Sequence, residues 1–231
     1  MRLDKFLANS GIGTRSEVKK IIKNGLVKVN GIVVLDSDYK IDENIDIIEV
    51  SENTINFKKD IYLMLNKPKG VICSTESSSR NVFNLLDSSY IHKKVHTVGR
   101  LDKDTEGLLI ITNNGEYTHN VISPKKQIEK EYYVELLYDI DIEKIKEFEK
   151  GVILDDGYKT LPAKYEIIDN NKVNLIITEG KFHQVKRMFI AIGNQVTYLK
   201  RIRIGSLQLD NSLKLGEYKE INEEQAFLVF K

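Results

Sequence analysis

A cluster of charged residues lies directly before a strongly apolar segment in the middle of the chain. Residues 98–116 read VGRLDKDTEGLLIITNNGE, so Arg100, Asp102 and Asp104 precede the run LLII. An apolar run of this kind, bounded by turn residues, predicts a buried strand. A carboxylate can act as a nucleophile, and a buried strand would hold the loop that carries it. Asp102 is therefore the first candidate catalytic residue.

Two further segments carry residue types that a catalytic carboxylate needs. In KEYYVEL, the alternation of a strand puts Lys130 and Tyr132 on one face. The segment EGKFHQVKRM is a turn that leads into a helix bearing Lys186 and Arg187. A nearby cation keeps a desolvated carboxylate ionised, and an aromatic ring can hold a planar substrate. Lys186 or Arg187 can supply the cation and Tyr132 the ring, but spacing alone does not bring the segments together.

Short apolar segments around these motifs predict the elements that position them. Strands are expected at residues 61–65, 108–112, 131–137, 163–168, 173–178 and 196–204, and helices at 141–150 and 182–191. Hairpin-like spacing with helices inserted between strands is typical of an α+β fold. We expect a mixed, mainly antiparallel sheet flanked by helices over residues 60–231.

The first fifty residues follow a different pattern. Thr14 and Glu17 form a capping box that begins a helix, and Asn30-Gly31 is a strong hairpin signal. Residues 1–31 hold seven basic residues against two acids. The basic residues are Arg2, Lys5, Arg15, Lys19, Lys20, Lys23 and Lys28. A cationic helix face can bind phosphates, so we expect a separate nucleic-acid-binding domain over residues 1–56, with a polar linker at about 51–60.

The composition excludes several other classes of protein. The 231 residues carry a net charge of only +1, so the basic blocks at 1–31 and 180–203 are local features. Cys73 is the only cysteine, which rules out an internal disulfide and is typical of a reducing cytoplasm. We expect no secretory leader and no membrane span. The scattered histidines and the single cysteine have no metal-ligand spacing, and no glycine-rich phosphate loop is present.

The N-terminal segment MRLDKFLANSGIGTRSEVKKIIKNGLVKVNG resembles the S4 (αL-type) RNA-binding domain. The resemblance covers roughly residues 1–50 and implies that a structured RNA is the partner. It implies no chemistry, because S4 domains are joined to several kinds of protein.

The segments GRLDKDTEGLLIITNNGE, KEYYVEL and EGKFHQVKRM together resemble the RsuA-type pseudouridine synthases, which join an S4 domain to a pseudouridine synthase fold. The resemblance extends over essentially the whole chain. It implies a cytoplasmic, monomeric enzyme that isomerises a uridine of ribosomal RNA with no cofactor and no metal. The form of the motifs and the compact length are most similar to the members that act on 16S rRNA, so we expect a 16S or pre-30S substrate.

The resemblance also implies roles for individual residues. Asp102 falls on the catalytic aspartate, Tyr132 on the tyrosine that stacks on the base, and Lys186 on the cation that pairs with the aspartate. Arg100 falls on the residue that occupies the gap left by the flipped nucleotide. The remaining cations, expected to contact RNA, are Arg2, Arg15, Lys19, Lys20, Lys23, Lys28, Lys130 and Arg187.

Three alternatives remain at this point. The substrate can be 23S rRNA, as for the nearest relatives of the 16S enzymes. The chain can be a non-catalytic S4-type RNA-binding or ribosome-assembly protein, which would not need Asp102, Tyr132 and Lys186 together. Finally, DKDT matches the Asp-x-Asp-x-Thr signature of phosphoryl-transferring hydrolases. That fold needs an apolar strand before the first aspartate and a later acidic pair for magnesium, and the sequence predicts neither.

Overall fold

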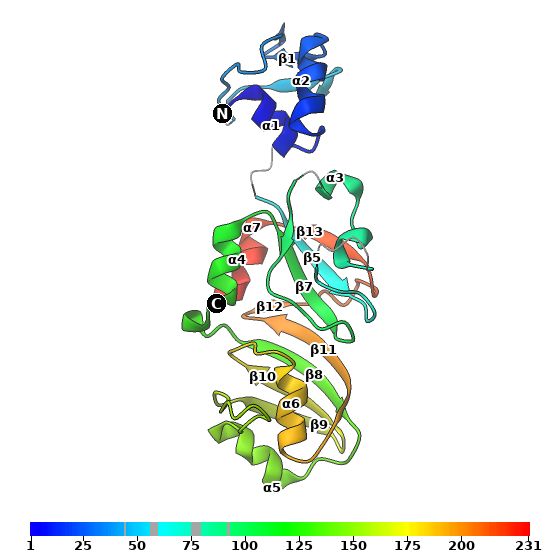
Figure 1. Ribbon diagram of the computed structural model, residues 1–231, viewed down its shortest axis with the longest axis vertical. Coiled ribbons are helices and arrows are strands. Elements are labelled where there is room, and N and C mark those ends of the chain that lie inside the picture. The colour runs from blue at the N-terminus through cyan, green and yellow to red at the C-terminus, as the bar shows by residue number, and fades with distance from the viewer. Residues whose placement is uncertain (44, 56–59, 75–79, 92) are drawn as a thin grey trace. The chain divides into compact units, whose positions relative to one another are not determined.

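The computed structural model describes residues 1–43, 45–55, 60–74, 80–91 and 93–231, and it divides the chain into two compact units. The first unit comprises residues 1–61 and 86–96, and the second comprises residues 62–85 and 97–231. Figure 1 shows the elements of each unit. The boundaries drawn from the sequence, at 1–56 and 60–231, stay a prediction.

The first unit packs two helices on a small antiparallel sheet. Its elements are α1 (Leu3–Asn9), α2 (Arg15–Lys23), β1 (Val27–Val29), β2 (Ile32–Val33), β3 (Ile48–Val50), β4 (Asn53–Thr54) and α3 (Ser88–Ile91). The sheet order is β2-β1-β3-β4. Residues 53–54, which were assigned to the linker, pair with β3 instead. Residues 56–59 of that linker lie outside the described part of the chain.

Local sequence signals account for the ends of these elements. The Thr14 side chain accepts a hydrogen bond from the amide of Glu17, whose carboxylate accepts one from the amide of Thr14, so the predicted capping box is confirmed. Asn30 and Gly31 both have positive φ, as a two-residue hairpin turn requires. The buried faces of both helices meet the strands in one apolar core. It comprises Leu3, Phe6, Leu7, Val18, Ile22, Val27, Val29, Ile41 and Ile48.

The second unit is built on a long mixed sheet. Its strands are β5 (Tyr62–Lys67), β7 (Glu106–Thr112), β8 (Lys130–Leu136), β9 (Lys164–Asp169), β10 (Lys172–Ile177), β11 (Val196–Ile204), β12 (Leu207–Gln208) and β13 (Tyr218–Ile221); β6 (His96–Thr97) spans the unit boundary. The main path runs β13-β5-β7-β11-β8-β10-β9. Along it, only β7 and β11 run parallel, so the expected mixed, mainly antiparallel sheet is confirmed.

Helices flank the two halves of this sheet, as Figure 1 shows. They are η1 (Val82–Leu85), α4 (Gly115–Ile122), η2 (Pro124–Lys126), α5 (Ile142–Ile145), η3 (Lys146–Lys150), α6 (Gln184–Ala191), α7 (Glu223–Ala226) and η4 (Phe227–Phe230). The Tyr117 hydroxyl donates to the Ala226 carbonyl at 2.8 Å and joins α4 to α7 over one half. Over the other half, Phe189 of α6 packs edge-on against Phe148.

Gly107 allows β7 to approach β11 closely where the two strands pair. Its φ is +100°, and a Cβ added there would lie 2.2 Å from the Arg201 carbonyl oxygen. Gly107 is also paired with Arg201 in the parallel register between β7 and β11. Only glycine tolerates both the left-handed backbone and this close approach. The residue therefore fixes where β7, and the loop before it, sit against β11.

Candidate active site

Asp102 lies in the loop that leads into β7, and its carboxylate faces the Lys186 ammonium and the His183 imidazole. Asp102 Oδ2 is 3.2 Å from Lys186 Nζ, and Oδ1 is 3.6 Å from His183 Nε2. Lys186 lies in the first turn of α6, and His183 lies just before that helix. The structure therefore brings together two motifs that are more than eighty residues apart in the sequence.

Lys186 is shared between two carboxylates. Its Nζ also donates to Asp104 Oδ1 at 2.5 Å. Burial raises the pKa of Asp104, but the hydrogen bond and the charge of Lys186, together with smaller contributions, hold that pKa below its ordinary value. The geometry makes Asp104 a second anchor for the cation that faces Asp102.

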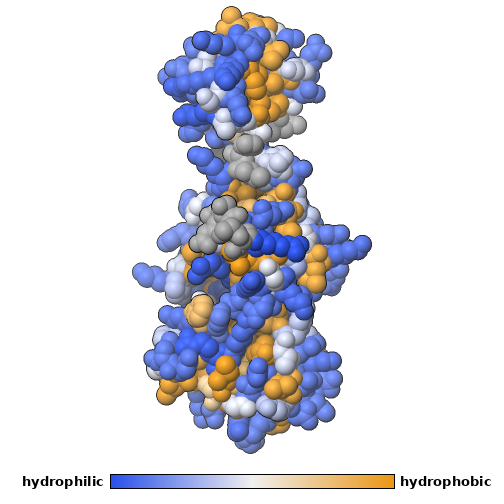
Figure 2. All heavy atoms as spheres, turned by 45° about the vertical axis from the view of Figure 1, so that its right-hand side comes forward, coloured by the Kyte–Doolittle hydropathy of each residue, from blue (hydrophilic) through white to orange (hydrophobic). Residues whose placement is uncertain are grey.

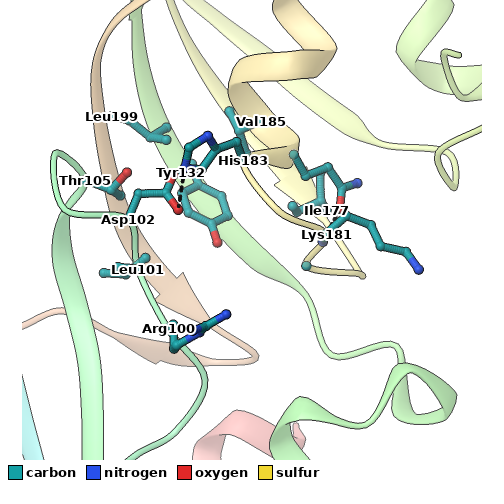
Figure 3. Close-up of a pocket in the computed structure, with 12 residues that line it drawn as sticks. Arg100, Leu101, Asp102, Thr105, Tyr132, Ile177, Lys181, His183, Val185 and Leu199 are labelled. Atoms are coloured by element: carbon teal, nitrogen blue, oxygen red, sulfur yellow. Dashed lines mark hydrogen bonds and ion pairs between the residues drawn. The ribbon is translucent and has the colours of Figure 1, made fainter. Parts of the chain in front are cut away.

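His183 is a site residue that the sequence did not reveal. Its backbone is left-handed, with φ at +50°, and its ring stacks on Phe182 at a centroid distance of 3.8 Å. Figure 3 shows the Asp102 carboxylate next to His183, with the Tyr132 ring close by and Arg100 extending away from them. The only sequence signal for His183 was its place in EGKFHQVKRM, directly before a basic helix.

Tyr132 completes the pocket from the sheet. It lies on β8, between Leu175 of β10 and Arg201 of β11, and only 8% of it is exposed. The ring lines a pocket of about 70 Å³ whose wall also holds Asp102 and His183. The apolar side chains of Leu101, Ile177, Val185 and Leu199 line the same pocket. A carboxylate and an aromatic ring thus meet in one pocket, and the Lys186 ammonium lies 3.2 Å from that carboxylate.

A buried lysine, also missed from the sequence, holds the loop of Asp102. The side chain of Lys67, at the end of β5, is fully buried. Its ammonium donates to the carbonyls of Asp102 at 3.0 Å, Thr105 at 2.9 Å and Pro68 at 3.1 Å. Burial lowers the pKa of Lys67, while nearby acids, Asp102 among them, oppose that effect. Lys67 thus fastens the backbone that carries the carboxylate.

A buried glutamate and glutamine fix the turn before α6. Glu179 accepts hydrogen bonds from the Tyr158 hydroxyl at 2.7 Å, the Leu161 amide at 2.9 Å and Gln184 Nε2 at 2.6 Å. The Gln184 side chain also accepts from the amide of Lys181. These contacts set the path of residues 179–184 and hence the position of His183.

The other predicted site residues lie in different settings. Arg100 is exposed and lines the Asp102 pocket. The guanidinium of Arg187 pairs with Asp155 and Asp156, which raises its pKa, so an RNA phosphate would compete with two carboxylates. Lys130, also expected to contact RNA, is half-buried, and its amine donates to the Ile128 carbonyl.

The predicted RNA-binding cations of the first unit differ in whether a carboxylate already pairs with their charge. Arg2 pairs with Asp4 and Asp38, so its charge is already matched. By contrast, the side chains of Lys19, Lys20 and Lys23 on α2 are exposed, and within the described residues none of them pairs with a carboxylate.

The remaining two predicted cations are Arg15, at the start of α2, and Lys28, on β1. Arg15 is exposed and lies 3.8 Å from Asp4, and Lys28 on β1 is half-buried. On the face shown in Figure 2, hydrophilic side chains cover much of the first unit beside apolar ones.

Two absences concern only the residues that the structure describes. None of their helices is long and apolar enough to cross a lipid bilayer. In the same residues, no group of three or more histidine, cysteine, aspartate or glutamate side chains is placed to hold a metal ion.

Comparisons with known proteins match both units. The family model for RNA pseudouridylate synthases matches residues 61–191, and the model for the S4 domain matches residues 1–47. The chain is 45% identical to the uncharacterized RNA pseudouridine synthase YtzG of Bacillus subtilis, over 99% of this chain and 98% of that protein. It is 41% identical to the ribosomal small subunit pseudouridine synthase A of Vibrio cholerae, over the full length of both.

A solved structure agrees with the sequence matches. The crystal structure of a pseudouridylate synthase, 38% identical in sequence, superposes with a TM-score of 0.71 and covers 99% of each chain. The fold and the domain order described above are therefore shared with a known enzyme over the whole chain.

Proposed function

This chain belongs to the RNA pseudouridylate synthase family and carries an S4 domain, and we propose that it converts one uridine of 16S ribosomal RNA to pseudouridine. One observation carries the proposal. The Asp102 carboxylate lies 3.2 Å from the Lys186 ammonium, at a pocket that Tyr132 lines. The choice of the small subunit rests on the 41% identity to the ribosomal small subunit pseudouridine synthase A of Vibrio cholerae.

The reaction explains why these residue types are needed. The C1′–N1 glycosidic bond of uridine breaks, a C1′–C5 bond forms, and the hydrogen on C5 is replaced by one on N1. We assign Asp102 as the group that acts on the nucleotide, by attack at C1′, attack at C6 or removal of a sugar proton. Lys186 pairs with the Asp102 carboxylate, which lines the pocket, and so orients it.

The substrate base must leave the RNA stack to reach Asp102. Flipping a base costs a few kcal/mol, and stacking on an aromatic ring returns about 1–3 kcal/mol. We assign that stacking to Tyr132, and we assign Arg100 to the gap that the base leaves. The exposed lysines of α2 then bind phosphates of the surrounding RNA without reading its sequence.

The setting of the reaction is also part of the proposal. We propose a monomer that acts in the cytoplasm on 16S rRNA or on a pre-30S particle, with no cofactor and no metal. The lone cysteine supports the cytoplasm, and the chemistry moves bonds within one nucleotide, so it requires no oxidant, reductant or phosphoryl donor.

Mapping of pseudouridine tests this function. The protein is incubated with 16S transcript, 23S transcript and small-subunit particles that lack the modification, and carbodiimide-treated RNA is read by reverse transcription. We expect one new stop in 16S rRNA, and none with the Asp102→Asn variant. A stop in 23S rRNA alone would assign the chain to the large subunit. No stop on any substrate would favour a non-catalytic RNA-binding protein.

A further inference from the structure

A second cavity adjoins the Asp102 pocket. It has a volume of about 350 Å³ and shares Arg100, Tyr132, Gly180 and Lys181 with the smaller pocket. Apolar side chains form one part of its wall, from Val98, Val121, Ile122, Pro124, Leu161 and Ile204. Its polar lining includes Lys130 and Arg201. A ligand that occupies this cavity would therefore lie next to a nucleotide held at Asp102.

Two cations, the buried Arg201 and the half-buried Lys130, line the cavity, and neither forms an ion pair within the described residues. Arg201 is only 4% exposed, and its Nε donates to the Leu108 carbonyl at 2.8 Å. The Nη2 of the same guanidinium is buried and has no hydrogen-bond partner in the described structure. Lys130 Nζ donates to the Ile128 carbonyl at 2.8 Å. Among the residues described, neither cation has a carboxylate within the 4.0 Å of an ion pair.

The nearest candidate counter-ion is already engaged. Glu179 lines the same cavity, but its two carboxylate oxygens accept from Tyr158, Leu161 and Gln184. The register between β8 and β11 sets Arg201 opposite Tyr132, two residues from Lys130. The fold thus holds two like charges together in a largely desolvated site. Buried charges without partners are costly, and such arrangements concentrate at functional sites.

We propose that this cavity binds one backbone phosphodiester of the RNA, next to the target uridine, through Lys130 and Arg201. A phosphodiester supplies the full negative charge that the two cations lack. Its oxygens can accept from the free Nη2 of Arg201 and from the Lys130 ammonium, and charge-assisted bonds of this kind are strong. The apolar wall offers no competing acceptor and can contact the adjoining ribose. The inference rests on the proposed function, because the phosphate belongs to the same RNA strand.

The ionisation of Lys130 should also make the RNA affinity depend on pH. Burial, together with the nearby charge of Arg201, lowers the pKa of Lys130 to about 8, and Glu179 opposes both effects. A bound phosphate favours the charged amine, so binding takes up a proton when Lys130 is partly neutral. Affinity should therefore fall as the pH rises through about 8. The other titratable groups that line the cavity are Arg100, Tyr132, Tyr158, Lys181 and Arg201.

The test replaces one phosphodiester at a time by a neutral methylphosphonate. Short RNAs that contain the mapped target uridine carry the replacement at each position near that uridine, and the dissociation constant of the full-length protein is measured. We expect one replacement to weaken binding to the wild type by about tenfold. In Lys130→Met the same replacement should change the dissociation constant by less than about twofold, because the cationic partner of that phosphate is already absent. Lys130→Arg should restore the sensitivity.

Controls separate this inference from the proposed function. Lys150→Met removes an exposed lysine of the same unit and should keep the full sensitivity to the replacement. Circular dichroism and urea unfolding check that each variant is folded, and the Arg201→Lys variant repeats the test at the second cation. If the wild type modifies its RNA but no single phosphate is coupled to Lys130 or Arg201, the inference is wrong and the function stands. If the wild type modifies no RNA, the proposed function has failed.

Discussion

At the scale of residues, the site depends on Lys186, which pairs with both Asp102 and Asp104. Lys186 contacts Asp104 at 2.5 Å and Asp102 at 3.2 Å, while His183 approaches Asp102 from its other oxygen. Asp102 can therefore change its charge without leaving Lys186 unpaired. A substitution at Asp102 is for this reason a test of chemistry more than of folding.

We predict that Asp102→Asn abolishes product formation, by about a thousandfold or more. The amide keeps the shape and a hydrogen bond but cannot act as a nucleophile or base. RNA affinity should stay within about twofold, because Asp102 is one small part of the contact surface. Single-turnover assays and filter binding measure the two effects.

Asp104→Asn is the matched control for this substitution. It removes the same charge two residues away, but the ion pair between Lys186 and Asp102 remains. We therefore expect the rate of product formation to fall by less than about tenfold. Normal turnover in Asp102→Asn would rule out the assigned role of Asp102.

We also predict that Lys67→Met reduces the rate of turnover by roughly tenfold to a hundredfold, with little effect on RNA affinity. The ammonium of Lys67 bonds the carbonyls of Asp102 and Thr105, and a displacement of a catalytic group by about 1 Å can cost this much. The free energy of unfolding should fall by about 1–3 kcal/mol, because buried carbonyls lose their donor. Lys69→Met, at an exposed lysine of the same turn, should change neither. Unaltered turnover in a folded Lys67→Met variant would contradict the positioning role.

At the scale of elements, the crossing of β7 and β11 decides where the Asp102 loop lies. Gly107 has a φ of +100° and approaches the backbone of Arg201 too closely for any side chain. The same crossing places Arg201 opposite Tyr132 on β8. One glycine therefore fixes the position of the Asp102 loop relative to the strand that carries Tyr132.

We predict that Gly107→Ala destabilises the protein by about 3 kcal/mol or more, since it adds a backbone clash to a left-handed conformation. Urea unfolding of the purified variant measures the change. Gly115→Ala is the matched control, because no atom lies within 4 Å of the added carbon at the start of α4. We expect that control to alter stability by less than about 1 kcal/mol. Equal stability of the two variants would show that the crossing tolerates a side chain.

At the scale of the whole molecule, the proposed RNA contacts are divided between the two units. The pocket lies in the second unit, whereas the exposed lysines of α2 belong to the first. Contacts from α2 to phosphates would add affinity that depends on salt but not on sequence. This division predicts that binding and chemistry can be weakened separately.

We predict that the double variant Lys19→Glu, Lys23→Glu binds RNA more weakly and with a flatter salt dependence. The slope of log K against log salt should fall by roughly 0.7–0.9 for each RNA phosphate that the variant no longer neutralises. Lys150→Glu with Lys159→Glu makes the same change of charge at exposed positions of the second unit and should leave the slope nearly unchanged. An unaltered slope in the first variant would mean that α2 does not meet phosphate.

The sequence by itself determined the local elements of this protein and the residue types of its site. Capping, hairpin and strand patterns depend on neighbours a few residues apart, so Thr14–Glu17, Asn30-Gly31 and the apolar strand after Asp102 could be predicted. Within the linker predicted at about 51–60, Asn53–Thr54 form β4, and a two-residue strand has too little periodicity to be recognised from the sequence.

Only the tertiary structure decided which side chains meet. The contact of Asp102 with Lys186, the three carbonyls around the Lys67 ammonium, and the pairing of Arg187 with Asp155 and Asp156 all join distant segments. The burial of Lys130 beside Arg201 follows from the register of β8 against β11. Long-range strand pairing fixes such neighbours, and no local pattern encodes which strands pair or in which register.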